Sequence, residues 1–276
     1  EEISLYSFIG LILIYRVKSL LSKYIFLILL GLCTLQTGCE DIDSSPNTSK
    51  YTYYDDISDI TYLNSSFYTT NYDLSGNAGE QIDLIVYDIV DTETIMNNKF
   101  SLGLNGQGYL SITNDGNDLY LQSRSNYNIF KISNTGEIAY LSSDTLDTKW
   151  LPSGLTYNSS NDSLVFLYRN TEKNNQYRLR EVSKLLSEQS KNDREFVLNG
   201  LDTTVYGALC IAYKEPNLYV LAFDGQEDVL ITMDYSSLNL ISNESVNDST
   251  AVGIDIVNNS IYLSYRDRTI SLFKEL

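Results

Sequence analysis

The sequence predicts an all-β fold, a β-propeller of about five, or six, four-stranded blades preceded by a signal peptide. After residue 50, short apolar runs alternate with Asn, Asp, Gly and Ser turns, without long helical periodicity. These runs recur in units of roughly 45 to 50 residues. One such unit cannot bury both of its faces alone, so a ring of neighbouring units is expected.

Each unit begins with an apolar strand that has small residues near its start. The first strands are expected at residues 58–63, 108–113, 153–157, 207–213 and 252–257. Second strands are expected at 67–68, 119–121, 164–167, 218–221 and 261–263. Third strands are expected at 82–87, 128–132, 177–182, 229–233 and 269–273. Fourth strands are expected at 99–104, 137–141, 195–198 and 239–242.

The last unit stops after its third strand, which leaves a sheet edge that something has to cover. Residues 50–54, KYTYY, are strand-like and precede the first unit. We therefore predict that they pair with the last blade and close the ring. A β-sandwich of similar strand count is the alternative, and the repeat period disfavours it.

The clearest repeat is GYLSITNDGNDLYLQSRSNYNIFKISNTGEIAYL, residues 108–141. It resembles blades of the NHL-like and TolB-like propeller families, which often read apolar strand, Asp-Gly turn, Leu-Tyr-Val strand, Ile-x-Lys-Ile and Thr-Gly turn. The resemblance covers residues 50–276 and implies a propeller there. It is specific for the fold and carries little information about function.

The N-terminal part reads as an export signal. Lys18 and Lys23 precede the apolar run 24–35, which has the length of a signal-peptide core and is short for a membrane span. Thr37-Gly38-Cys39 resembles the end of a lipobox, which implies that Cys39 is lipidated. Residues 1–38 are thus predicted to be a signal peptide.

A second apolar run, residues 4–15, precedes this segment. We interpret residues 1–16 as upstream translation and Val17 as the true start. The alternative is a membrane anchor formed by both apolar runs, which Arg16, Lys18 and Lys23 would interrupt.

Residues 39–49 are expected to be a lipidated cysteine followed by a polar tether. The acidic residues 40–43 resemble the surface-export signal of Bacteroidetes lipoproteins. This resemblance implies a bacterial cell-envelope protein that is lipid-anchored to the outer membrane and surface-exposed. An ordinary polar tether is the alternative.

Composition excludes several classes of function. The formal net charge of −17 opposes binding to a phosphate backbone, so no nucleic-acid partner is expected. The absence of histidine excludes a Ser-His-Asp triad and any His-ligated zinc site. Beyond the leader and Cys39, Cys210 is the one cysteine, which excludes a disulfide framework. We expect it to be a small buried apolar residue.

The sequence contains no catalytic motif, and neither a cofactor nor a metal is predicted. Residues 114–118 and 224–228 are rich in Asp and Asn, the oxygen ligands that calcium prefers. Both lie between strand-like runs, where Asp-Gly is a common hairpin turn. We interpret both as turns.

A metal-dependent, gluconolactonase-like hydrolase is the enzymatic alternative. Such propellers hold one divalent ion in the central channel, where it would polarise a carbonyl and activate water. The comparable positions here are Asp59, Ser111, Gly154, Leu209 and Gly253. Asp59 alone is a plausible ligand, so this alternative is disfavoured.

A binding function agrees better with the sequence than hydrolysis does. Tyr109, Trp150 and Tyr206 each lie at or just before the start of an inner strand, where they could surround one mouth of the channel together with Asp59. Aromatic rings there would suit a glycan, a peptide or an envelope protein. The alternative is that they pack between blades. We therefore predict a lipid-anchored, non-catalytic binding or scaffolding propeller.

Overall fold

The computed structural model describes residues 56–72, 82–90, 93–104, 110–123, 127–133, 137–143, 148–173, 175–184, 192–199, 210–246 and 250–276. All of them belong to one compact unit, Tyr51–Leu276. They form nineteen strands, and none of the described residues builds a helix long and apolar enough to cross a membrane.

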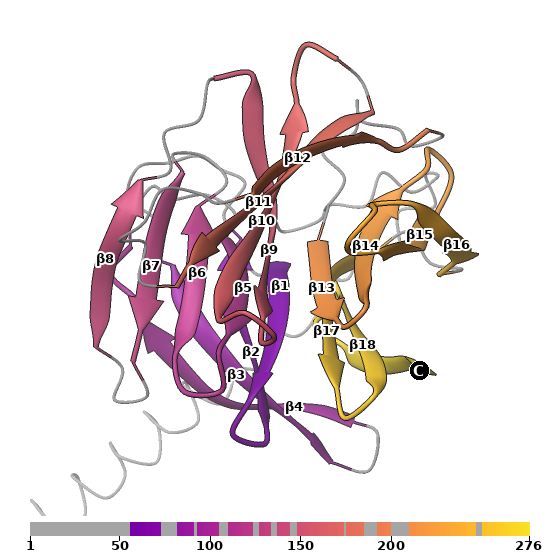
Figure 1. Cartoon of the computed structure of the whole chain (residues 1–276). Coiled ribbons are helices and arrows are strands. Elements are labelled where there is room, and N and C mark those ends of the chain that lie inside the picture. The colour runs from indigo at the N-terminus through magenta and orange to yellow at the C-terminus, as the bar shows by residue number, and fades with distance from the viewer. Residues whose placement is uncertain are drawn as a thin grey trace, which may run out of the picture. The chain divides into compact units, whose positions relative to one another are not determined.

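The strands form five antiparallel sheets, which we number as blades 1 to 5 (Figure 1). Blade 1 contains β1 (Asp56–Leu63), β2 (Ser66–Tyr72), β3 (Asp83–Val90) and β4 (Glu93–Ser101). Blade 2 contains β5 (Leu110–Asn114), β6 (Leu119–Ser123), β7 (Asn128–Ile132) and β8 (Ile138–Ser143). Blade 3 contains β9 (Trp150–Asn158), β10 (Ser163–Asn170), β11 (Gln176–Ser183) and β12 (Asn192–Val197).

Blade 4 contains β13 (Cys210–Lys214), β14 (Asn217–Phe223), β15 (Asp228–Asp234) and β16 (Leu240–Ser245). Blade 5 has three strands in the described part of the chain, β17 (Ala251–Val257), β18 (Ser260–Tyr265) and β19 (Ile270–Glu275). The predicted all-β propeller is thereby confirmed, with five blades. The prediction that the last unit ends after its third strand agrees with β19.

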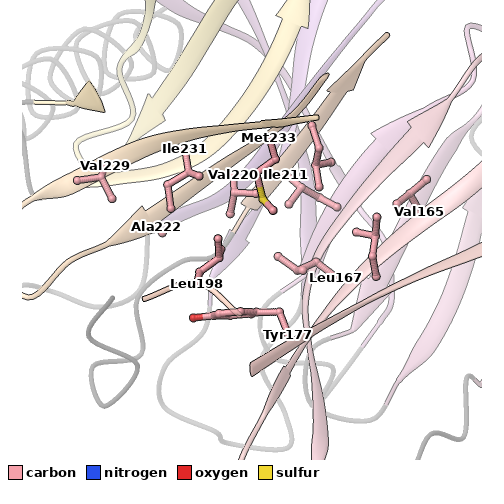
Figure 2. Close-up of a cluster of buried hydrophobic side chains, with 12 residues drawn as sticks. Val165, Leu167, Tyr177, Leu198, Ile211, Val220, Ala222, Val229, Ile231 and Met233 are labelled. Atoms are coloured by element: carbon pink, nitrogen blue, oxygen red, sulfur yellow. The ribbon is translucent and has the colours of Figure 1, made fainter. Parts of the chain in front are cut away.

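The first strand of each blade lies at the centre. β1 contacts β5 and β17, β5 contacts β9, and β13 contacts both β9 and β17, so the five inner strands form a closed ring. Each pair of adjacent blades encloses its own hydrophobic core, because a strand presents alternate side chains to its two neighbours. Five cores between five sheets exclude the sandwich alternative. Figure 2 shows the core between blades 3 and 4, where Leu167, Ile211 and Met233 meet.

The predicted polar turns join the strands. Asn64-Ser65 and Asn258-Asn259 are two-residue turns with positive φ at both positions, as a type I′ hairpin requires. In the predicted turn 114–118, the Asp115 carboxylate accepts hydrogen bonds from the backbone N–H groups of Asn117 and Asp118. Asp224 does the same for Gln226 and Glu227. Both acidic segments are therefore turns, as interpreted.

Cys210 is fully buried and forms no disulfide, and its Sγ lies 2.9 Å from the carbonyl oxygen of Val252. This confirms the expectation of a small buried residue. The predicted closing strand, residues 50–54, lies outside the described residues, as do residues 1–49. Three of the six residues of β19 are exposed and one is buried, whereas six of the seven residues of its counterpart β15, which pairs with β16, are buried.

Candidate functional site

Trp150 is the first residue of β9, but it does not line an open mouth. Only 1% of its surface is exposed, and it packs with Tyr120, Leu155 and Tyr168 in the core between blades 2 and 3. The alternative of packing between blades therefore describes its position in the structure. Tyr109 and Tyr206, the other two aromatic candidates, lie outside the described residues.

Polar groups surround Trp150 where β9 begins. The Arg178 guanidinium lies over the indole ring, with Cζ 4.4 Å from the ring centroid. Arg178 pairs across the sheet with Tyr168, and Gln122 Nε2 of blade 2 donates a hydrogen bond of 3.2 Å to the Tyr168 hydroxyl. These contacts link Gln122, Tyr168, Arg178 and Trp150, which we call the Trp150 cluster.

Three polar atoms of the Trp150 cluster are buried without a hydrogen-bond partner: Trp150 Nε1, Gln122 Oε1 and Arg178 Nε. A buried donor or acceptor left unsatisfied costs on the order of 1–3 kcal/mol. Buried polar groups are therefore normally satisfied by protein, ordered water or a ligand. The set combines two donors with one acceptor, which matches a group that both accepts and donates.

The charge of Arg178 is compensated on the outer strand of blade 3. Its guanidinium forms ion pairs with Glu195 and, at 3.7 Å, with Asp193 on β12. Arg180 makes a two-pronged contact with Asp193, at 2.9 and 2.8 Å. The positive charge of the Trp150 cluster is therefore paired with carboxylates of β12.

Asp59 is completely buried in the inner ring. Its Oδ1 accepts hydrogen bonds from the backbone N–H groups of Ile60, at 3.1 Å, and Ile254 of blade 5, at 3.3 Å. The carboxylate therefore joins two blades.

The described residues contain no group of three or more acidic or cysteine side chains that could hold a divalent ion. At the comparable position in β17, Gly253 has no room for any side chain, because an added Cβ would lie 2.8 Å from Asp59 Cα. Leu209 lies outside the described residues.

A second polar cluster, which sequence reasoning missed, lies where the inner strands end. Lys184, just after β11, forms ion pairs with Asp115 at 3.1 Å and with Asp162 at 2.8 Å. Hydrogen bonds from Lys184 to both carboxylates raise the pKa of Lys184. Burial, together with the hydrogen bond that the Tyr157 hydroxyl donates to Asp162, raises the pKa of Tyr157 to about 12.

Burial opposes ionisation of Asp115, but backbone N–H groups and Lys184 outweigh it, so the pKa of Asp115 is lowered. Nearby, the buried carboxylate of Glu181 accepts hydrogen bonds from Asn158, at 3.1 Å, from Ser163, at 2.5 Å, and from Asn161. These carboxylates are held by other side chains and turns of the protein. These two groups therefore stabilise blades 2 and 3 and offer little to a ligand.

No family model and no curated protein matches the sequence. Among solved structures, the chain is similar to virginiamycin B lyase from Staphylococcus aureus, with a TM-score of 0.42 and 17% identity over 83% of this chain and 67% of that one. A catalytically inactive form of that lyase with quinupristin gives a TM-score of 0.41 and 16% identity over 81% and 71%. A luciferin-regenerating enzyme gives a TM-score of 0.47 and 14% identity over 76% and 70%.

At these identities and TM-scores, the likeness concerns the fold and not the chemistry of a site. The described sheets themselves define the chain as an all-β, five-bladed propeller.

Proposed function

We propose that the chain is a lipid-anchored envelope propeller that binds a hydroxyl-rich ligand, a glycan, and does not catalyse a reaction on it. The observation that carries this proposal is the group of unsatisfied polar atoms around Trp150, at the end of the blades where β9 begins. The anchor is proposed from Cys39 and the apolar run before it.

The ligand class follows from the atoms left without partners. A hydroxyl group can accept a hydrogen bond from Trp150 Nε1 and donate one to Gln122 Oε1. An ordered water would satisfy the same atoms. Because these atoms are buried, a ligand hydroxyl reaches them only when the side chains that cover the Trp150 cluster move aside, and it then takes the place of the water and keeps its hydrogen bonds. Saccharides carry several hydroxyls on an apolar ring, which suits polar atoms set among aromatic side chains.

The hydrolase alternative finds no support in the inner ring. A metal-dependent hydrolase needs an ion with an open coordination position to activate water. Asp59, its one acidic candidate, accepts backbone hydrogen bonds from β1 and β17 instead.

Tryptophan fluorescence provides a direct test, because Trp150 is the only tryptophan of the chain. Soluble peptidoglycan fragments, chitotetraose and maltoheptaose are each titrated into a protein of residues 40–276, which contains all five blades. We expect a saturable change in emission for at least one of them. Gln122→Met, which removes the buried amide, should weaken that binding about tenfold, since one lost hydrogen bond is worth about 1 kcal/mol or somewhat more.

Gln226→Met is the matched control, because Gln226 is exposed in a turn of blade 4. It should leave the affinity unchanged. No saturable change with any of the three glycans would contradict a glycan ligand and leave an ordered water as the occupant. Turnover of a lactone that requires calcium and disappears in Asp59→Asn would contradict the non-catalytic assignment.

A further inference from the structure

Blades 5 and 1 meet at a seam that no direct chain connection spans within the described residues. The other four pairs of adjacent blades follow one another along the chain, whereas the contacts at this seam join residues about 190 positions apart. The seam also has the smallest of the five cores, with six buried hydrophobic residues against seven to twelve in the other four. Polar contacts also join the two blades at this seam.

Two carboxylates cross the seam in opposite directions. Asp59 on β1 accepts the N–H of Ile254 on β17, at 3.3 Å. Asp255 on β17 accepts the N–H of Tyr62 on β1, at 2.6 Å. Each inner strand thus supplies one acceptor and one donor, which holds the two strands in register.

The Asp255 carboxylate is the end of a chain of donors that reaches blade 2. Asn114 Nδ2 donates to the Thr61 hydroxyl, at 2.6 Å, and to the carbonyl oxygen of Tyr62, at 3.0 Å. Thr61 in turn is hydrogen-bonded to the Asp255 carboxyl group. One oxygen of this group accepts the N–H of Tyr62, and the other accepts the N–H of Ile256, at 2.8 Å. Hydrogen bonds therefore connect this carboxyl group directly to blade 1 and, through Thr61, to blade 2.

We propose that the propeller opens and closes at the seam between blades 5 and 1, and that proton binding to the carboxyl group of Asp255 controls this opening. In the closed ring the carboxyl accepts hydrogen bonds from both strands, from Tyr62 of β1 and from Ile256 of β17. Opening the seam separates the two strands and returns the carboxyl to solvent. The closed and open forms therefore bind a proton with different affinities, and the equilibrium between them depends on pH.

The direction of the pH dependence follows from the pKa of Asp255 in the closed form. Burial raises the pKa of Asp255 to about 7, against the lowering effect of its donors Ile256, Tyr62 and Thr61. Solvent in the open form returns the pKa toward 3.8. Between these values the closed form holds the proton more tightly, so each pH unit of increase favours opening about tenfold. The seam is tightest in acid and loosens up to about pH 7.

Other titratable groups lie on the elements that pack against β17. They are Asp56, Asp59 and Tyr62 on β1, Cys210, Tyr213 and Lys214 on β13, Tyr219 on β14, and Tyr262 and Tyr265 on β18. Lys214 is hydrogen-bonded to Asn259 in the turn after β17. The shift of Asp255 arises from burial and not from a neighbouring charge.

Hydrogen exchange followed by mass spectrometry tests the proposal. Exchange in peptides from β1 and β17 is divided by exchange in peptides from β10 and β14 at each pH, which removes the chemical pH dependence. From pH 5 to pH 7 this ratio should rise up to about 100-fold in the natural protein. In Asp255→Asn, whose side chain stays neutral, the ratio should stay flat.

Asp224→Asn is the matched control, because Asp224 also accepts two backbone N–H groups but lies in a turn of blade 4. It should keep the full pH dependence. A flat ratio in the natural protein, or an unchanged slope in Asp255→Asn, would overturn the proposal. If Asp255→Asn does not fold, Thr61→Val removes one donor to the carboxylate and should move the pH window upward, and an unmoved window would equally overturn it.

Discussion

Gly253 tests how tightly the inner strands of blades 5 and 1 are packed. An added Cβ at this position would lie 2.8 Å from both Asp59 Cα and Ile60 N, and 2.6 Å from Ser264 Oγ. Two of the three contacts are with backbone atoms, which cannot rotate away as a side chain can. Gly253→Ala therefore has to push β17 away from β1 or distort one of the two strands.

The cost can be estimated against a glycine in open space. Overpacking a well-packed interior by a single group typically costs 1–3 kcal/mol, and we expect about 3 kcal/mol here because backbone atoms are involved. At Gly116 nothing lies within 4 Å of an added Cβ, but φ is +90°, so Gly116→Ala should cost about 1 kcal/mol through strain alone. Alanine lowers the entropy of the unfolded chain similarly in both variants, so that contribution cancels in the comparison.

Urea unfolding followed by Trp150 fluorescence measures both variants, because this tryptophan is buried in the folded protein and exposed in the unfolded one. We expect Gly253→Ala to lose about 2 kcal/mol more free energy of unfolding than Gly116→Ala. Equal losses would show that β1 and β17 can separate at little cost and would refute the close packing of the inner ring.

Two further predictions concern the rest of the molecule. Lys184→Met should lower the free energy of unfolding at pH 7 by about 1 kcal/mol, because the carboxylate of Asp115 is left without its cation, whereas Lys184→Arg should not. Because the pKa of Asp115 is lowered in the folded protein, its contribution is present above about pH 4 and is lost below it. The deficit of Lys184→Met in urea unfolding should therefore shrink in acid, and a constant deficit would contradict the ion-pair explanation. Cys39→Ser should abolish incorporation of labelled palmitate in a bacterial host, and continued labelling would contradict lipidation at Cys39.

The buried strands could be predicted closely from the sequence. β7 runs from Asn128 to Ile132, the range expected from its apolar residues between polar turns. The outer strands were harder to place. β4 begins at Glu93, six residues before the expected start, because its solvent-facing residues carry no apolar alternation and pairing with β3 sets its length.

The polar clusters could not be predicted from local sequence. Asp115 and Lys184 are 69 positions apart, and Tyr62 and Asp255 are 193 positions apart, so only the ring brings them together. For Trp150 the position along the strand could be predicted, but the burial of the side chain could not. Its place at the start of an inner strand was correctly inferred, but the depth of its side chain depends on blade 2 covering it.

The described part of blade 5 has the same inner three strands as the other blades, with β19 as the counterpart of β15. In blade 4, β15 pairs with β14 on one side and with β16 on the other, whereas β19 pairs with β18 alone among the described strands. The prediction that residues 50–54 supply the fourth strand concerns residues outside the described part of the chain and stays a prediction. Within the described residues the ring is closed where β1 meets β17, because Asp59 accepts the N–H of Ile254 and Asp255 accepts the N–H of Tyr62.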